Sequence, residues 1–251
     1  MGNESNGHPD TQTVALHGFT QNHRCLGPIT EHLAERSTVT AVDLPGHGTA
    51  TELAALDCPA SADHLAARCG VGHWFGYSLG GRVALHVALQ HPEVVESLVV
   101  LGATPGIADP SERERRRRLD SERASMLTAL GVEEFCRQWL EMPLFEHLPQ
   151  WAYFMEERGS NTVEGLSGSL LNAGTGSMEP LWERLGEIEM PVLVLAGDLD
   201  AKFCETASAL VEAIGTNATF AAVPGTGHAA HLESPERTAA IIGAFRDRLG
   251  S

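Results

Sequence analysis

The sequence predicts an α/β fold with a mostly parallel, doubly wound sheet, interrupted in the middle of the chain by a helical insertion. Two observations predict the sheet. Short apolar runs rich in β-branched residues recur along the 251 residues, and helical patterns lie between several of them. Such runs are typical of strands that helices cover on both faces. The insertion is predicted by a stretch with clustered charge and no convincing buried strand, from about 108 to 186.

The candidate strands are continuously apolar, and each ends at Gly, Pro or Asp. They lie at 13–19, 38–46, 71–78, 95–103, 191–198 and 219–227. The helical patterns lie at 28–36, 79–91, 205–214 and 234–249. The last of these opens with Ser234 as a candidate N-cap and Pro235 in the first turn, a favoured place for proline.

The segment 108–186 is expected to form a helical cap over one end of the sheet. It begins with SERERRRRLD, where Ser111 and Glu114 have the spacing of a capping box. Its apolar residues recur at helical spacing, as in Phe135 and Trp139. Insertions of this kind act as lids over sites at strand ends.

Length and charge limit the class of protein. A chain of 251 residues suits one large α/β domain, so we expect a core of 1–107 and 187–251 around the cap. The formal net charge is −16, from 33 acidic and 17 basic residues, which disfavours nucleic acid and anionic membranes as partners. An anionic small-molecule substrate would have to meet local positive charge.

No apolar run approaches the roughly 18 to 20 residues needed to span a membrane, and the polar start MGNESNGHPDTQ lacks a signal-peptide core. We therefore expect a cytoplasmic protein without a membrane span. The five cysteines are scattered and lack CxxC spacing, which favours mostly buried free thiols. We expect no metal and no cofactor, and the oligomeric state stays open.

The stretch GYSLGGR carries the first chemical signal. Gly76, Ser78 and Gly80 match the GxSxG pattern of a nucleophile elbow, a sharp strand-to-helix turn that exposes a serine hydroxyl. Taken alone, the pattern also fits a Gly-rich turn with a capping serine. A catalytic serine needs a histidine to take its proton and usually an acid to orient that histidine.

Candidates for both partners follow later strands, where they would reach the same edge of the sheet as Ser78. His228 lies in a Gly-flanked turn directly after the last strand, and Asp200 follows the strand before it. The order Ser, Asp, His is that of α/β-hydrolases. The alternatives are His231 for the base, and Asp198, Glu233 and Asp109 for the acid.

An oxyanion hole needs two backbone N–H groups aimed at developing negative charge. We expect one from Leu79, after the serine, and one from Phe19, in the loop after the first strand. His17 is expected to make a structural hydrogen bond within that loop. The segment DLPGHG (43–48) is interpreted as a tight turn without a catalytic role.

Arginines concentrate near the elbow and at the start of the cap. Arg82 falls in the first turn of the helix after Ser78, where a solvated surface arginine is the alternative interpretation. Five arginines occupy six positions in the cap: Arg113, Arg115, Arg116, Arg117 and Arg118. Charge runs usually face solvent, but helical residues advance by about 100 degrees each, so a packed helix cannot expose all five. One face combines Arg113, Arg116 and Arg117, which could bind carboxylates bidentately.

With these residues placed, the chain resembles the α/β-hydrolase superfamily over nearly its whole length. The motifs HGFTQNH, DLPGHG, GYSLGGRVAL, DLDAKF and GHAAHLESP, with the arginine-rich cap start followed by PLF, are similar to one family within it. That family is the 2-succinyl-6-hydroxy-2,4-cyclohexadiene-1-carboxylate synthases of menaquinone biosynthesis. The elbow is common to many hydrolases, whereas the combination of motifs is far more specific.

The resemblance implies a lyase that eliminates pyruvate from a 5-enolpyruvyl precursor, with Ser78 as the base, activated by His228 and Asp200. It also implies a set of residues around a substrate with several carboxylates: Tyr77, Arg82, Arg116, Trp139 and Arg158. In the cap, Arg115 or Arg117 could take the place of Arg116. The competing hypotheses are a serine esterase or C–C bond hydrolase, and a catalytically silent binding protein on the same fold.

Overall fold

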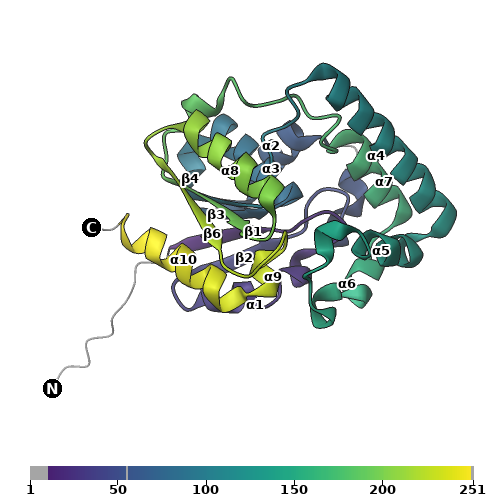
Figure 1. The fold of residues 1–251 in the computed structure, drawn as a ribbon, viewed down its shortest axis with the longest axis horizontal. Helices are drawn as coiled ribbons and strands as arrows, with labels where there is room; N and C mark the ends of the chain where they lie inside the picture. Colours follow the sequence, from purple (N-terminus) through teal and green to yellow (C-terminus); the bar gives the residue numbers. More distant parts are fainter. Residues whose placement is uncertain (1–10, 55, 250–251) are drawn as a thin grey trace.

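The computed structural model describes residues 11–54 and 56–249, so most of the polar start lies outside the described residues. Six parallel strands form one sheet in the order β2-β1-β3-β4-β5-β6 (Figure 1). The strands are β1 (Gln12–Leu16), β2 (Thr38–Val42), β3 (Gly72–Tyr77), β4 (Val95–Leu101), β5 (Val192–Gly197) and β6 (Ala218–Val223). The six predicted runs each hold one strand, and the predicted α/β fold is confirmed.

Helices cover both faces of the sheet (Figure 1). One face carries α2 (Cys58–Cys69), α3 (Leu79–Gln90) and α8 (Ala201–Ile214), and the other carries α1 (Pro28–Ala34), α9 (Ala230–Glu233) and α10 (Pro235–Asp247). Successive strand residues enter opposite cores: Trp74 packs in the first core and Phe75 in the second, and both are fully buried. Burial on both faces explains why the strands are continuously apolar.

The chain leaves β1 for β2 on one side and then returns to add β3 on the other side, so the winding reverses between β1 and β3. In doubly wound sheets the crevice outside the carboxyl ends of the strands at such a point is where ligands bind. The loop with Phe19 follows β1, and Ser78 follows β3. The topology therefore brings the two segments to one crevice.

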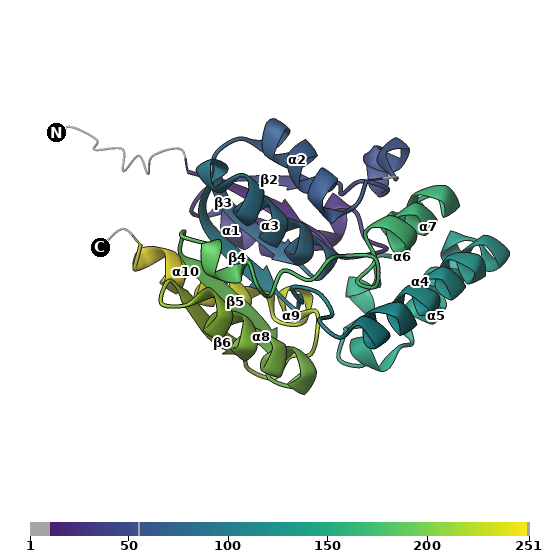
Figure 2. The ribbon, with the colours of Figure 1, turned by 90° about the horizontal axis from the view of Figure 1, so that it is seen from above.

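Between β4 and β5 the chain forms four α-helices, which we call the cap together with the segments that connect them. They are α4 (Pro110–Leu130), α5 (Val132–Leu140), α6 (Met155–Gly159) and α7 (Val163–Asn172). The cap lies beside one end of the sheet (Figure 2) and has its own small apolar core, which includes Leu127, Phe135 and Leu166. The domain boundaries at 108 and 186 stay a prediction.

Two helix starts differ from the predictions. The capping box of Ser111 and Glu114 is wrong, because Asp109 caps α4 by accepting the N–H of Glu112 at 2.7 Å. Pro110 then fills the first helical position, where its fixed φ suits a helix. Helix α8 begins at Ala201, before the predicted 205, because Asp200 acts as its N-cap.

Ser234 is the N-cap of α10 and Pro235 its first residue, as predicted, although the Ser234 side chain makes no capping bond in the described chain. All five cysteines are free thiols, four of them buried, also as predicted. Across residues 11–54 and 56–249, no helix is both long and apolar enough to span a membrane. The same residues contain no group of three or more side chains placed to hold a metal.

Candidate active site

Ser78 stands on a strained turn between β3 and α3. Its φ of 52° and ψ of −107° lie in a region that residues with a side chain rarely adopt. The flanking glycines are required by space: a Cβ on Gly76 would lie 2.4 Å from the Gly80 carbonyl oxygen, and one on Gly80 would lie 2.5 Å from that of Leu16. This local geometry is that of the nucleophile elbow.

Asp200 and His228 come from the ends of β5 and β6 and meet at the same edge. The Nδ1 atom of His228 lies 3.0 Å from Oδ2 of Asp200, and their side chains are only 2% and 11% exposed. The other carboxylate oxygen, Oδ1, accepts the N–H of Phe203 at 3.2 Å, so the N-cap of α8 also fixes this acid. Because an ionised carboxylate only accepts hydrogen bonds, Nδ1 carries the proton and Nε2 is the basic nitrogen.

The competing residues from the sequence have other partners. Asp198 accepts the N–H of Gly225 at 2.7 Å, the turn-forming role expected of it. Glu233 accepts the N–H groups of Gly227 and Ala229, the two neighbours of His228, at 2.5 and 3.0 Å. It therefore shapes the loop that holds the histidine.

His231 is a buried packing residue in this structure. Its ring lies 4.2 Å from that of Tyr77, and burial lowers its pKa to about 3. A neutral, fully enclosed ring is poorly placed to exchange protons with a ligand.

The two predicted oxyanion donors lie in segments that are tied together. The N–H of Gly80 donates to the His17 carbonyl at 3.0 Å, which joins the start of α3 to the loop after β1. Hydrogen bonds among the described residues leave the N–H groups of Phe19 and Leu79 unused. Leu79 is the first residue of α3, a position whose N–H has no partner within the helix.

His17 and the DLPGHG turn support this loop. The N–H of Leu44 donates to Nε2 of His17 at 3.0 Å, and Nδ1 of His17 donates to the Gly18 carbonyl at 2.8 Å, which confirms the hydrogen bond expected within the loop. Burial, with the nearby His47 ring, lowers the pKa of His17 to about 3.

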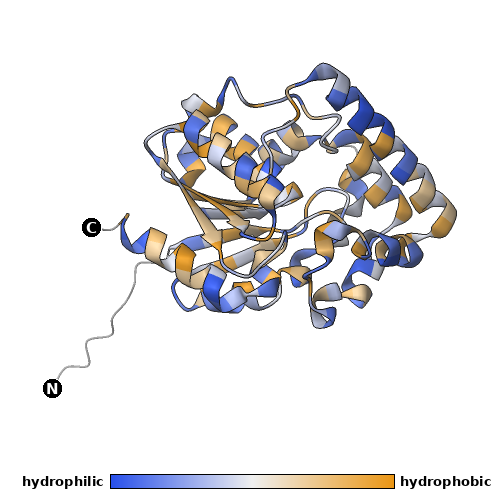
Figure 3. Ribbon diagram, viewed as in Figure 1, coloured by the Kyte–Doolittle hydropathy of each residue, from blue (hydrophilic) through white to orange (hydrophobic). Residues whose placement is uncertain are grey.

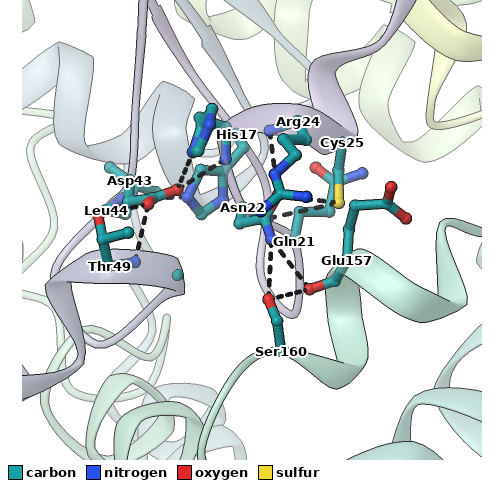
Figure 4. A network of polar contacts seen from close by, with 12 residues as sticks. His17, Gln21, Asn22, Arg24, Cys25, Asp43, Leu44, Thr49, Glu157 and Ser160 are labelled. Atoms are coloured by element: carbon teal, nitrogen blue, oxygen red, sulfur yellow. Dashed lines mark hydrogen bonds and ion pairs between the residues drawn. The ribbon is translucent and has the colours of Figure 1, made fainter.

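Asp43 is the centre of the neighbouring turn (Figure 4). It accepts the backbone N–H groups of His23 and Thr49, each at 2.8 Å. Burial alone would raise the pKa of Asp43, but these hydrogen bonds and those from the same two side chains hold the pKa well below its usual range. The two bonds from backbone N–H groups hold the chain of this turn in place, which agrees with the structural interpretation of DLPGHG.

The same loop is also fixed to the cap. Asn22 donates through Nδ2 to the Glu157 carbonyl at 2.9 Å and to Ser160 Oγ at 3.2 Å (Figure 4). Asn161 donates through Nδ2 to the Thr20 carbonyl at 2.8 Å. The segment that carries Phe19 is therefore held by α6 and the residues just after it.

A cavity of about 570 Å³ lies between the sheet edge and the cap, and both Ser78 and His228 line it. Its wall also holds four cationic side chains: Arg82, Arg116, Arg123 and Lys202. Among the described residues that line it, Glu112 is the one acid. The chain as a whole has a net charge of −16, so this cavity is a locally positive region of an acidic protein.

Arg82, Arg116 and Trp139 lie on the cavity wall, where the family resemblance implied them. Arg82 is only 8% exposed and donates to the Ala173 carbonyl, so the alternative of a solvated surface arginine is wrong. Burial lowers the pKa of Arg82, yet an arginine stays charged in proteins.

Two of the implied substrate residues do not reach the wall. The ring of Tyr77 packs behind it, 5.4 Å from the ring of His228 and 4.2 Å from that of His231. Arg158 is fully buried and donates to Thr20 Oγ1 and, at 2.7 Å, to the Tyr153 carbonyl. Its helix, α6, faces the loop after β1, which turns Arg158 away from the cavity.

The expected arginine face of α4 is only partly correct. Arg116 lines the cavity, whereas Arg113 donates to the Ile107 carbonyl at 3.2 Å and Arg117 pairs with Glu114 at 2.9 Å. Arg115, offered as a substitute, is 61% exposed. Sequence reasoning missed Arg123, although it follows Arg116 by seven residues, or about two turns of the same helix face.

The comparisons with known proteins agree over almost the whole chain. The alpha/beta hydrolase family matches residues 14–241. A putative 2-succinyl-6-hydroxy-2,4-cyclohexadiene-1-carboxylate synthase of Bacillus subtilis (strain 168) is 32% identical over 92% of this chain and 89% of its own length. The synthase of that name from Enterobacter sp. (strain 638) is 30% identical, over 91% and 89%.

Two solved structures extend the likeness. The structure of MenH from S. aureus is 30% identical, with a TM-score of 0.87 over 99% of this chain and 98% of its own. A thermophilic esterase from Thermogutta terrifontis is 23% identical, with a TM-score of 0.82 over 96% and 91%, and shows the shared fold alone. The chain belongs to the alpha/beta hydrolase family and, within it, to the family of the 2-succinyl-6-hydroxy-2,4-cyclohexadiene-1-carboxylate synthases.

Proposed function

We propose that the protein is a lyase that converts 2-succinyl-5-enolpyruvyl-6-hydroxy-3-cyclohexene-1-carboxylate into 2-succinyl-6-hydroxy-2,4-cyclohexadiene-1-carboxylate and pyruvate. The observation that carries the proposal is the set of four cations on the cavity that Ser78 and His228 line. This substrate has three carboxylates, so the cations would neutralise and orient it. A hydrolase for neutral esters gains nothing from them.

In the proposed mechanism Ser78 acts as a general base. Nε2 of His228 takes the hydroxyl proton of Ser78, and Asp200, held at 3.0 Å from Nδ1, stabilises the imidazolium. The serine oxygen removes the proton from ring carbon 2, which the succinyl ketone acidifies. The electron pair forms the C2=C3 bond, the C3=C4 bond moves to C4=C5, and the C5–O bond breaks. The departing enolate oxygen takes the proton held on His228, which releases the enol of pyruvate and restores the neutral histidine.

The oxyanion hole has a role in this elimination without an acyl-enzyme. Removal of the C2 proton places negative charge on the succinyl ketone oxygen. The N–H groups of Phe19 and Leu79 are the donors proposed to meet that charge, and donors fixed in advance are worth about 3 kcal/mol or more each. Their fixed separation follows from the bond between Gly80 and His17.

The test follows pyruvate release from freshly prepared precursor, because the proposed reaction defines pyruvate as one of its products. We expect the wild-type protein to accelerate release well above the spontaneous rate, with a dienyl product of the same stoichiometry. Turnover of p-nitrophenyl esters without acceleration of pyruvate release would instead support the serine esterase and overturn the lyase.

A further inference from the structure

We infer that the cap wall of the cavity holds a separate carboxylate subsite, formed by Arg123, Ser169 and Trp139 beside Arg116, which binds the succinyl carboxylate of the substrate. The family motifs implied neither Arg123 nor Ser169. The assignment rests on the proposed function, because it names one group of that substrate. We call these four residues the cap subsite.

A single buried acid holds two cations of the cap subsite in place. Asp120 is 1% exposed, and its Oδ1 atom lies 2.8 Å from Nε of Arg116 and 3.6 Å from a terminal nitrogen of Arg123. Its Oδ2 atom accepts the N–H of Gly176 at 3.4 Å. One carboxylate faces two guanidinium groups, so the local charge is close to +1 and favours a second anion.

Arg123 is oriented toward the cavity by an aromatic wall. Its guanidinium carbon lies 5.2 Å from the centre of the Trp139 ring, and both side chains line the cavity. The Arg123 side chain is 18% exposed. A partly desolvated guanidinium stacked on an aromatic ring keeps little conformational freedom, which suits it to a fixed, bidentate partner.

Two further donors at this wall have no partner. The indole Nε1 of Trp139 and the hydroxyl of Ser169 are buried and make no hydrogen bond within the described part of the chain. Ser169 is 2% exposed, and both residues line the cavity. Leaving a buried donor unsatisfied is costly, so two such donors beside two arginines point to an anion that accepts from them.

The chemistry of the substrate decides which carboxylate fits. Proton removal and loss of the enolpyruvyl group occur on the ring, which must lie at Ser78 and His228, and Arg82 is one helical turn from Ser78. The ring and enolpyruvyl carboxylates are close to those events. The succinyl carboxylate ends a flexible chain directed away from them, so it is the group that reaches the opposite wall.

Binding of a stable ligand tests the cap subsite without catalysis. The probe is 2-succinylbenzoate, an aromatic relative of the product that keeps the ring carboxylate and the succinyl chain. Its matched partner, 2-butyrylbenzoate, replaces the distal carboxylate by a methyl group. We expect Arg123→Gln to weaken 2-succinylbenzoate binding about tenfold by calorimetry, and Ser169→Ala about threefold. Both variants should change the binding of 2-butyrylbenzoate by less than about twofold.

Arg118→Gln is the matched control, because Arg118 lies on the same helix, is 62% exposed and pairs with Glu114. It should bind both probes like the wild type. Thermal unfolding checks each fold, and Ser169→Ala keeps the test open if Arg123→Gln unfolds.

Three results would overturn the cap subsite. In the first, the variants lose affinity equally for the two probes; in the second, neither variant loses affinity for 2-succinylbenzoate. In the third, the wild type does not bind 2-succinylbenzoate. Tight, Arg123-dependent binding in a protein that releases no pyruvate would overturn the proposed reaction and leave a dicarboxylate site in place.

Discussion

The two walls of the cavity are built differently. On the sheet wall, Ser78, Asp200 and His228 follow three strands, and their positions are fixed by a strained turn, a helix N-cap and a buried hydrogen bond. On the cap wall, the charged side chains project from α4, whose first turns are strongly hydrophilic (Figure 3). In the proposed reaction, this difference places proton transfer on the wall whose positions are fixed locally and recognition of anions mainly on the cap.

Removing the sheet-wall residues should have the largest effect. Ser78→Ala and His228→Ala are each expected to lower kcat for pyruvate release by about three orders of magnitude or more, because the base and its activator act as one unit. Steady-state kinetics of the single variants, with pyruvate detected in a coupled assay, measure the loss.

The double variant decides whether the two residues act together. It should be little slower than either single variant, since the second change removes nothing further. Losses that multiply would mean that Ser78 and His228 work independently, and the sheet wall would then not be one proton-transfer unit.

Arg82 is the exception to this division between the walls, because it lies on the sheet wall and yet, in our proposal, binds a substrate carboxylate. Arg82→Gln should lower kcat/KM for the precursor about 100-fold, the scale expected when a charged hydrogen bond to a substrate carboxylate is lost. Turnover of a neutral p-nitrophenyl ester should fall by less than about threefold.

Arg68→Gln provides the matched control, since Arg68 is exposed in the last turn of the neighbouring α2. It should leave both activities unchanged. If Arg82→Gln slows the two substrates equally, Arg82 shapes the cavity instead of binding a carboxylate.

The contrast between the walls also explains what the sequence could predict. The strands, and the sheet edge at which Ser78, Asp200 and His228 meet, were predictable because a continuous apolar run followed by a turn residue fixes both the strand and the edge where the next side chains emerge. Asp200 is both the N-cap of α8 and the hydrogen-bond partner of His228. Because it caps the helix, α8 begins earlier than predicted, but the position of Asp200 beside His228 is as expected.

The cap could be predicted only in outline. Helical spacing predicted one face for Arg113, Arg116 and Arg117, but the burial of each side chain and the partner it finds decide where its guanidinium lies. Arg113 donates to the Ile107 carbonyl, whereas Arg116 pairs with the buried Asp120 and lies on the cavity wall. Arg158 was named from the resemblance, but its position could not be predicted, since it donates to Thr20, which is 138 residues away in the chain. Helix α2 was left without a prediction, although the sequence carries the signals of its start: Asp57 caps it and Pro59 lies in its first turn.

Acid should weaken the sheet side of the molecule. Burial lowers the pKa of His47 to about 4, and burial with the nearby His47 lowers that of His17 to about 3, whereas an unfolded histidine keeps a pKa of about 6.5. Between these values the unfolded chain binds more protons, so stability is full above pH 6.5 and falls as the pH drops. Each such histidine should cost about 2 kcal/mol of unfolding free energy by pH 5.

Urea unfolding at pH 7, 6 and 5 measures this slope. His47→Gln should reduce the slope, while His147→Gln, at the cap histidine whose side chain is 39% exposed, should leave it unchanged. If His147→Gln reduces the dependence of stability on pH and His47→Gln does not, the acid-sensitive region lies in the cap.

The smallest expected effect concerns Glu112, the one acid on the described cavity wall, which is 61% exposed and lies 3.2 Å from Arg115. Glu112→Gln should raise kcat/KM for the precursor about twofold at low salt, because it removes a repulsive charge from the path of an anion. The gain should vanish near 0.5 M salt, where screening shortens the reach of exposed charges to about 4 Å. Glu133→Gln is the control, since Glu133 makes a similar exposed pair with Arg137 on α5 but does not line the cavity. A gain in both variants would mean that the net charge of the protein, and not the cap wall, attracts the substrate.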